Sequence, residues 1–343
     1  MFVQCPFGYA RLLVGITILL CCLVLMIVLY PWILVDNVRD NYAPLKNEDC
    51  YCGDELLCYS SAYKRGARFP CSLYPKLEEM KLLSRQHPRV AANFRDEDIV
   101  FVTFARIIYY DVGISEQHVR YDVRTIVNVQ ANELRNVCNL EVRRFQFDKY
   151  PSFVRHLKQY HFKKILMAEV WSEGDVIPAF WAIDASVRFT NDVALRNIHE
   201  SVRRNRTEDF VMRSPSATNV KWPTNFGMLS FLPMNPDVGT RMMRESNSIF
   251  IRRSPFSAEI LKWDFLCGTH EPCMAPDGHR VSCDLSVRSD ASCHRYDQSS
   301  LNILLGNVFG RSRWLSSWNE ALQIAREDRM LDELRALECN GTS

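Results

Sequence analysis

The sequence predicts an α/β domain with a mainly parallel sheet flanked by helices, preceded by a transmembrane helix and a cysteine-rich stem. The observations are a long uncharged stretch near the start, an even number of cysteines beyond it, and short apolar segments that alternate with helical ones from about residue 96. Strands alternating with helices are typical of parallel sheets covered by helices. We therefore divide the chain into a tail (1–11), a membrane anchor (12–35), a stem (36–95) and a folded domain (96–343).

The predicted anchor, Leu12 to Val35, contains no charged residue and is long enough to cross a bilayer. A cleaved signal peptide has a shorter apolar core, and Tyr30 and Trp32 suit the membrane–water interface instead. Arg11 precedes the stretch and acidic residues follow it, which favours a cytosolic N-terminus. The chain is thus predicted to be a single-pass type II membrane protein. Its net charge of +2 gives no reason to expect a nucleic-acid partner.

Ten cysteines follow the predicted anchor: Cys50, Cys52, Cys58, Cys71, Cys138, Cys267, Cys273, Cys283, Cys293 and Cys339. An even number in a luminal domain indicates disulfide bonds. A zinc site is the competing interpretation of the four that crowd the stem, although no histidine spacing typical of a zinc finger accompanies them. Asn205, in Asn-Arg-Thr, is a candidate glycosylation site.

Apolar patterns place the elements of the domain. Strands are expected at 99–105, 125–129, 164–170, 179–183 and 227–232. Helices are expected at 151–160, 255–266, 297–305 and 317–337.

Asp184 directly follows the strongly apolar strand at 179–183. Ligands of parallel sheets bind outside the carboxyl ends of strands, so this carboxylate is placed to hold a metal ion or a ribose hydroxyl. Ser186 adds a hydroxyl and Arg188 a possible phosphate partner. The alternative is an aspartate that only caps a turn.

A second polar group precedes the helix expected at 297–305. It comprises His294, Arg295, Asp297 and Gln298. A polar loop beside a helix N-terminus suits an anionic ligand. The alternatives are an N-cap role for Asp297 and a hydrogen-bonded, non-ligating ring for His294.

Together, Ala182-Ile-Asp-Ala-Ser186 and Tyr296-Asp-Gln-Ser-Ser-Leu-Asn302 resemble the two signatures of nucleotide-sugar glycosyltransferases with the GT-A (Rossmann-like) fold. More closely, the motifs are similar to those of an uncharacterised family of single-pass type II proteins abundant in nematodes. The tail, anchor, stem and domain also resemble the arrangement of Golgi glycosyltransferases. The resemblance implies a Golgi or endoplasmic reticulum membrane location with a luminal catalytic domain.

The resemblance also implies roles for the candidate residues. Asp297 would be the catalytic base or would orient the donor sugar. Asp184, Ser186, Arg188, Arg295 and Gln298 would bind the donor. Asp184 and His294 would hold Mn²⁺ or another divalent cation. The second carboxylate of the usual Asp-x-Asp signature is missing here, so the site could instead work without metal, using Arg188 and Arg295 on the leaving diphosphate.

The expected activity is therefore transfer of a sugar from a nucleotide-sugar donor to a glycan, protein or lipid acceptor. The alternative is a non-catalytic luminal or cell-surface binding protein that retains the fold. A luminal sulfate transferase is disfavoured because the sequence has no phosphate-binding loop that ends in Lys-Ser or Lys-Thr.

Overall fold

The structure is a computed structural model. It describes residues 47–91, 93–105, 119–123, 140–143, 145–184, 187–189, 191–212, 215–280, 282–284, 289–309 and 322–324. The chain divides into two compact units, Met1–Cys50 and Tyr51–Ser343. In the first unit only the 3-10 helix η1 (Asn47–Cys50) is described.

A six-stranded sheet forms the centre of the second unit, in the order β5-β4-β3-β6-β11-β8. The first four strands in this order are parallel, and β11 is antiparallel to both β6 and β8. The strands are β3 (Ile99–Ala105), β4 (Val119–Val123), β5 (Leu140–Arg143), β6 (Ala179–Asp184), β8 (Phe210–Met212) and β11 (Ser248–Arg252). The protein is therefore a mixed α/β fold, with a largely parallel sheet.

Eight α-helices are described around this sheet. They are α2 (Tyr74–Glu79), α4 (His161–Ser172), α5 (Asp192–Arg203), α6 (Phe226–Phe231), α7 (Pro236–Gly239), α8 (Pro255–Gly268), α9 (Glu271–Met274) and α10 (Tyr296–Phe309). Three small antiparallel pairs join β1 (Tyr51–Cys52) to β2 (Glu55–Leu56), β9 (Pro215–Asn219) to β10 (Met242–Arg244), and β7 (Val187–Phe189) to β12 (Leu322–Ile324).

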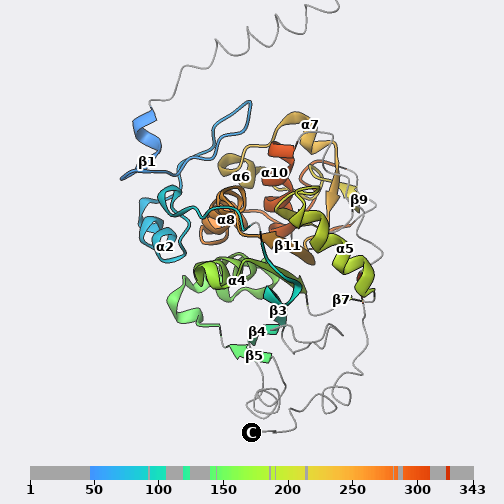
Figure 1. Ribbon diagram of the computed structural model, residues 1–343. Coiled ribbons are helices and arrows are strands. Elements are labelled where there is room, and N and C mark those ends of the chain that lie inside the picture. The colour runs from blue at the N-terminus through green and yellow to red at the C-terminus, as the bar shows by residue number, and fades with distance from the viewer. Residues whose placement is uncertain are drawn as a thin grey trace, which may run out of the picture. The chain divides into compact units, whose positions relative to one another are not determined.

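The two faces of the sheet are covered by different helices (Figure 1). Side chains alternate between the faces of a strand. Phe180 and Ala182 of β6 belong to the large core that α4, α8 and α10 share. Trp181 points to the other face, where its indole N–H donates a hydrogen bond of 3.0 Å to His199 of α5. This alternation also assigns Asp184, two residues after Ala182, to the α4 face.

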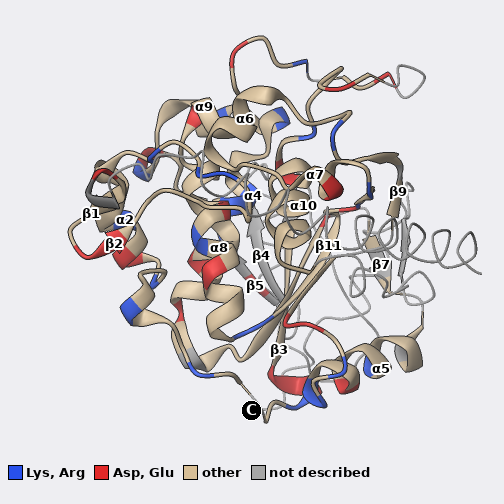
Figure 2. Cartoon of the chain, turned by 90° about the horizontal axis from the view of Figure 1, so that it is seen from above, with Lys and Arg blue, Asp and Glu red and all other residues tan. Residues whose placement is uncertain are grey.

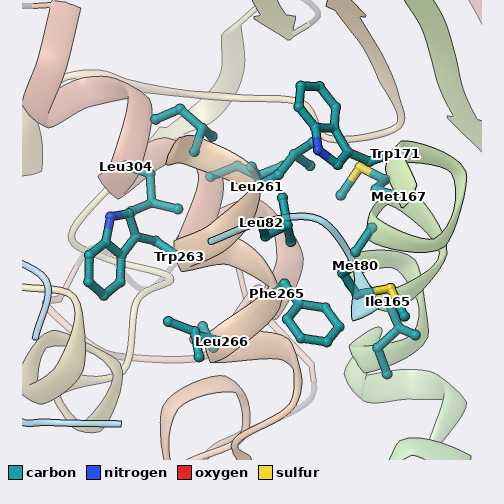
Figure 3. Close-up of a cluster of buried hydrophobic side chains, with 14 of the residues drawn as sticks. Met80, Leu82, Ile165, Met167, Trp171, Leu261, Trp263, Phe265, Leu266 and Leu304 are labelled. Carbon is teal, nitrogen blue, oxygen red and sulfur yellow. The ribbon is translucent and has the colours of Figure 1, made fainter. Parts of the chain in front are cut away.

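The segment predicted as a stem packs into this core. Figure 3 shows Met80 and Leu82 among side chains of α4 and α8, including Ile165 and Phe265. Polar contacts join the same parts, because Lys262 of α8 contacts Glu55 at 2.5 Å with both side chains 2% exposed. The structure thus differs from the boundary expected at residue 95, since the compact unit begins at Tyr51. Burial of the apolar side chains of 57–83 explains the difference.

Disulfide bonds occur in the folded unit, as the cysteine count predicts. Three pairs are described: Cys52–Cys71, Cys267–Cys273 and Cys283–Cys293. Cys50 and Cys58 are also disulfide-bonded. Cys138 and Cys339 lie outside the described residues.

Several predicted elements are confirmed. The strands expected at 99–105 and 179–183 are β3 and β6, and the helices expected at 255–266 and 297–305 are α8 and α10. The helix expected at 151–160 is instead two 3-10 helices, η6 (Ser152–Arg155) and η7 (Leu157–Gln159).

Two strand predictions are wrong. Residues 164–170 belong to α4, and 227–232 fall largely in α6. A short apolar run looks the same whether it forms a strand or a helix. Most residues of α4 are buried, which removes the polar face that would have marked it as a helix, and α6 is only six residues long. In α6, Asn225 caps the helix by accepting a hydrogen bond from the Gly227 N–H at 2.8 Å.

Other expectations fall on parts that are not described, among them the strand at 125–129 and the anchor at 12–35. Of the expected helix at 317–337 only Leu322–Ile324 is described, and it is a strand. Within the described residues, no helix has the length and apolarity needed to cross a membrane.

Acidic and basic residues are interspersed over the described elements (Figure 2), in keeping with the small net charge. Three of the described lysines are nevertheless buried: Lys163, Lys164 and Lys262. A buried ammonium is strongly destabilising unless a carboxylate accompanies it.

The Glu55–Lys262 pair offers a test of how the cysteine-rich segment is attached. Glu55→Gln leaves a buried ammonium without its counter-charge, and we expect it to lower the free energy of unfolding by about 3 kcal/mol. Urea unfolding of the full-length chain, followed by tryptophan fluorescence, measures the change.

Glu79→Gln is the matched control, because the Lys76–Glu79 pair is exposed and its loss should change stability by less than about 0.5 kcal/mol. Equal effects of the two substitutions would contradict the assignment of Glu55 to the core.

Candidate functional site

Asp184 lies at the carboxyl end of β6, at the edge of the parallel part of the sheet. Its backbone N–H donates to the carbonyl of Asn247 at 2.8 Å, which fixes the strand end beside the loop that leads into β11. The side chain lies on the α4 face and is 30% exposed. Asp184 is therefore more accessible than Asp297 and Asp264.

Asp297 lies in the first turn of α10, where a carboxylate is favoured by the helix dipole. Its Oδ2 accepts a hydrogen bond of 2.9 Å from the hydroxyl of Ser246, in the loop between β10 and β11. The side chain is 8% exposed. Within the described part of the chain, Oδ1 has no hydrogen-bond partner.

Lys163 of α4 joins the two aspartates. Its Nζ is 2.5 Å from Asp184 Oδ1 and 3.2 Å from Asp297 Oδ2. The ring of Tyr160 lies on a further side, with its centroid 4.8 Å from Nζ. The ammonium is therefore enclosed by two carboxylates and an aromatic ring, and its side chain is 7% exposed.

Lys164, the next residue of α4, is hydrogen-bonded to the start of α10. Its Nζ is 2.8 Å from Asp264 of α8 and donates to the backbone carbonyl of Asp297 at 3.0 Å. Ser300 donates to the same Asp264 oxygen at 2.8 Å. Helices α4 and α8 approach closely here. A Cβ at Gly268 of α8 would overlap the Lys164 side chain of α4. The position of Asp297 is thus fixed by a buried charge pair.

His294 is 1% exposed, and both of its ring nitrogens are used. Nδ1 accepts a hydrogen bond from the Asn225 N–H at 3.1 Å, so Nε2 carries the proton and donates to the Met274 carbonyl at 3.0 Å. Burial lowers the pKa of His294 to about 4, and the ring is therefore neutral at physiological pH. These bonds connect the α10 entry loop to the α6 and α9 regions.

Gln298 and Asn302 fix the backbone of Arg244. Gln298 Nε2 donates to the Arg244 carbonyl at 2.8 Å, and Asn302 both donates to that carbonyl and accepts from the Arg244 N–H. Gln298 Oε1 accepts from Arg295 Nη1 at 3.1 Å. The amide of Gln298 is thus occupied, and it orients the Arg295 guanidinium.

Two tyrosines flank the aspartates in unusual backbone conformations. Tyr160, before α4, has φ of 58°, and Tyr296, the first residue of α10, has φ of 35°. Their rings are 6.4 Å apart. The Tyr296 hydroxyl is buried without a hydrogen-bond partner among the described residues. Positive φ at a bulky residue is strained, and such strain is concentrated at functional sites.

The charged groups of this cluster influence one another. Burial is the largest influence on Lys163 and opposes its charge, but the two carboxylates outweigh it and raise the pKa of Lys163 above its usual value. Burial raises the pKa of Asp184, against the effect of the Lys163 ammonium. Burial also raises the pKa of Tyr160, whose hydroxyl feels both aspartates, Lys163 and Arg295. Tyr160 is therefore within electrostatic reach of all four charges.

These residues do not fit a divalent cation. The position that would be ligated by Asp184 and Asp297 is filled by the Lys163 ammonium, and His294 offers no free nitrogen. Across the described residues, no three His, Cys, Asp or Glu side chains are grouped so as to hold a metal ion.

The structure brings together Asp184 and Asp297, which are far apart in sequence, with Arg295 and Gln298 beside them. The side chain of Arg188, in β7, and the whole of Ser186 lie outside the described residues. Lys163 is absent from the sequence-based candidates. The strand predicted at 164–170 begins one residue after it, and the signal that could have revealed it is a pair of adjacent lysines at the start of an apolar run.

The similarity of this chain to known proteins is limited. The family described as "Protein of unknown function (DUF1647)" matches residues 54–168, which includes much of the cysteine-rich segment and the first part of α4. No curated protein is similar to the chain in sequence.

The solved structure of mouse xyloside xylosyltransferase 1, in its apo form, is similar to the chain at 12% identity and a TM-score of 0.31. The match covers 61% of this chain and 80% of that one. A TM-score this low assigns neither a fold nor an activity to the chain.

Burial of His294 predicts a loss of stability in acid. Its folded pKa of about 4 lies below its usual value of 6.5, so the unfolded state binds the proton more readily between these pH values. The stabilisation is complete above pH 6.5 and is lost as the pH falls towards 4, by up to about 3 kcal/mol.

Urea unfolding of the full-length chain at a series of pH values measures this loss. His294→Gln should lower stability at pH 7.5 and make its decline between pH 6.5 and 4 shallower. An unchanged slope would contradict the assignment of a neutral, buried ring.

Proposed function

We propose that the protein is a nucleotide-sugar-dependent glycosyltransferase of the secretory pathway, which transfers a sugar to a glycan, protein or lipid acceptor. The observation that carries the proposal is the meeting of two motifs at the carboxyl end of β6, in the parallel part of the sheet. Asp184 and Asp297 are 113 positions apart in the chain, yet both contact the Lys163 ammonium. Each was selected from its motif alone, and a shared site is what the GT-A-like interpretation requires.

Asp297 is the candidate general base for the acceptor hydroxyl. Lys163 and Ser246 hold its Oδ2, which orients the carboxylate. Within the described residues Oδ1 is left without a partner and could accept the proton of an incoming hydroxyl. A base must lie within hydrogen-bond reach of the proton that it removes, and this arrangement provides one oxygen for that purpose.

Asp184 and Arg295 are the candidate donor contacts. Asp184 is partly exposed and its Oδ2 could bind a ribose hydroxyl. Arg295 is partly buried and oriented by Gln298, so its guanidinium could meet the leaving diphosphate. Gln298 would then act by positioning Arg295 and would not touch the sugar. Stabilisation of the departing negative charge would be the main catalytic contribution.

The membrane topology is part of the proposal. The uncharged stretch at 12–35 would anchor the chain in the Golgi or endoplasmic reticulum membrane, with the disulfide-bonded unit in the lumen. Asn205 is exposed and its Oδ1 accepts a hydrogen bond from Arg252. Among the described residues its side-chain nitrogen has no hydrogen-bond partner, which leaves it available for glycosylation.

A non-catalytic binding protein with the same fold is the second candidate. It is favoured by the low exposure of Asp297 and by the carboxylate missing from the first motif. Nucleotide binding and transfer activity separate the two candidates.

Nucleoside diphosphates should stabilise the protein. In thermal unfolding of the full-length chain, the matching diphosphate should raise the midpoint, because a ligand that binds only the folded state adds about 2.7 kcal/mol at one hundred times its Kd. Asp184→Asn should reduce the shift, and Asp290→Asn, which alters an exposed ion pair with Lys221, should not. No shift with any of the uridine, guanosine, cytidine and adenosine diphosphates would favour the binding protein.

Asp297→Asn tests the base directly. Removing a general base lowers the rate by about 10²-fold or more, and we expect that loss in kcat with the diphosphate shift retained. Sugar transfer from the donor selected by the diphosphate panel, monitored by release of the nucleoside diphosphate, measures it. Near-normal turnover of the variant would remove Asp297 from this role, and Asp290→Asn again serves as the control.

A further inference from the structure

We propose that Lys163, assisted by Arg295, takes the place of a divalent cation, so that the site binds an anionic diphosphate ligand without metal. The inference rests on the proposed function, which supplies the diphosphate. It differs from the sequence-based expectation in naming Lys163 as the central cation.

The Lys163 ammonium occupies the position between two carboxylates that a bound metal ion would occupy. Its Nζ lies between Asp184 and Asp297 at 2.5 and 3.2 Å, with the Tyr160 ring on another side. A calcium or manganese ion held by both carboxylates would lie about 2.0–2.6 Å from their oxygens, in the space that the ammonium fills. Placing a metal there would bring two cations into contact while displacing a buried ion pair.

The net charge of the site agrees with the replacement of a divalent cation by Lys163 and Arg295. Two carboxylates and one divalent cation sum to zero, and so do the two carboxylates of Asp184 and Asp297 with the cations of Lys163 and Arg295. Lys163 stays protonated because the carboxylates raise its pKa. The site would therefore present the electrostatic environment of a metal-loaded carboxylate pair.

Helix α4 holds the Lys163 ammonium where a divalent cation would otherwise lie. Lys164 is bound to Asp264 and to the carbonyl of Asp297, which fixes both α4 and the start of α10. Lys163 is then carried on a rigid element, and its ammonium can donate to a phosphate oxygen as well as to the aspartates, since each ammonium has three donors.

The first arm of the test uses metal alone. Calorimetric titration of the full-length chain with MnCl₂ should give the same heat for the wild type and for Asp184→Asn. A wild-type Mn²⁺ site that Asp184→Asn abolishes would overturn the inference. Lys163→Met removes the ammonium, and the carboxylate pair should then bind Mn²⁺ in a manner that a further Asp184→Asn change abolishes.

The second arm adds the diphosphate found by thermal unfolding. Its Kd should be the same within about twofold in EDTA and in Mn²⁺, and Lys163→Met and Arg295→Met should each weaken it about tenfold, the loss of one charge-assisted hydrogen bond. Lys158→Met, an exposed lysine of η7, is the control. Binding that requires Mn²⁺ overturns the inference.

The two hypotheses fail in distinguishable ways. If no diphosphate binds under any condition, the proposed function fails and this inference falls with it, whatever the metal titration gives. If a diphosphate binds only with Mn²⁺, the proposed function survives and this inference alone fails. Because Arg295→Met leaves the buried ion pairs of Lys163 intact, it keeps the test informative should Lys163→Met unfold.

Discussion

The ion pairs of Lys163 with Asp184 and Asp297 connect three elements that are distant in the chain: α4, the end of β6 and the start of α10. Burying an ammonium costs several kcal/mol, and the cost is offset only when carboxylates approach with good geometry. That requirement restricts how α4 and α10 can lie on the sheet. The candidate site is thus also a place where the packing of the domain is specified, because a shift of either helix would leave a buried charge without its partner.

Buried lysines are also paired with carboxylates elsewhere in the core. Lys164 with Asp264 and Lys262 with Glu55 are ion pairs in which both side chains are almost wholly buried. Both pairs involve α8, which packs against α4, α10 and the cysteine-rich segment. Buried pairs of this kind contribute little net stability compared with apolar replacements, but they strongly disfavour alternative arrangements. Helix α8 therefore acts as a common support for the site and for the segment at 51–95.

The polar residues of the second motif divide into two groups. Gln298, Ser299 and Asn302 hold backbone groups of neighbouring segments, and His294 does the same through both nitrogens. Asp297 and Arg295 instead retain atoms without partners in the described structure. A motif that is dense in polar residues thus contains mostly structural hydrogen bonds.

The sequence by itself determined the α/β class, the strands β3 and β6, the helices α8 and α10, and the disulfide bonding. It also selected Asp184 and Asp297, whose functional roles stay predictions although the structure brings both to Lys163. These follow from local signals: apolar runs bounded by charges, helix-start residues and cysteine number. Tertiary structure decided what depends on contacts between distant segments. It joined 51–95 to the domain, made 164–170 a helix, and placed Lys163 between the aspartates. A buried apolar run has no periodicity that separates strand from helix, and a lysine gives no local indication of which carboxylate it will meet.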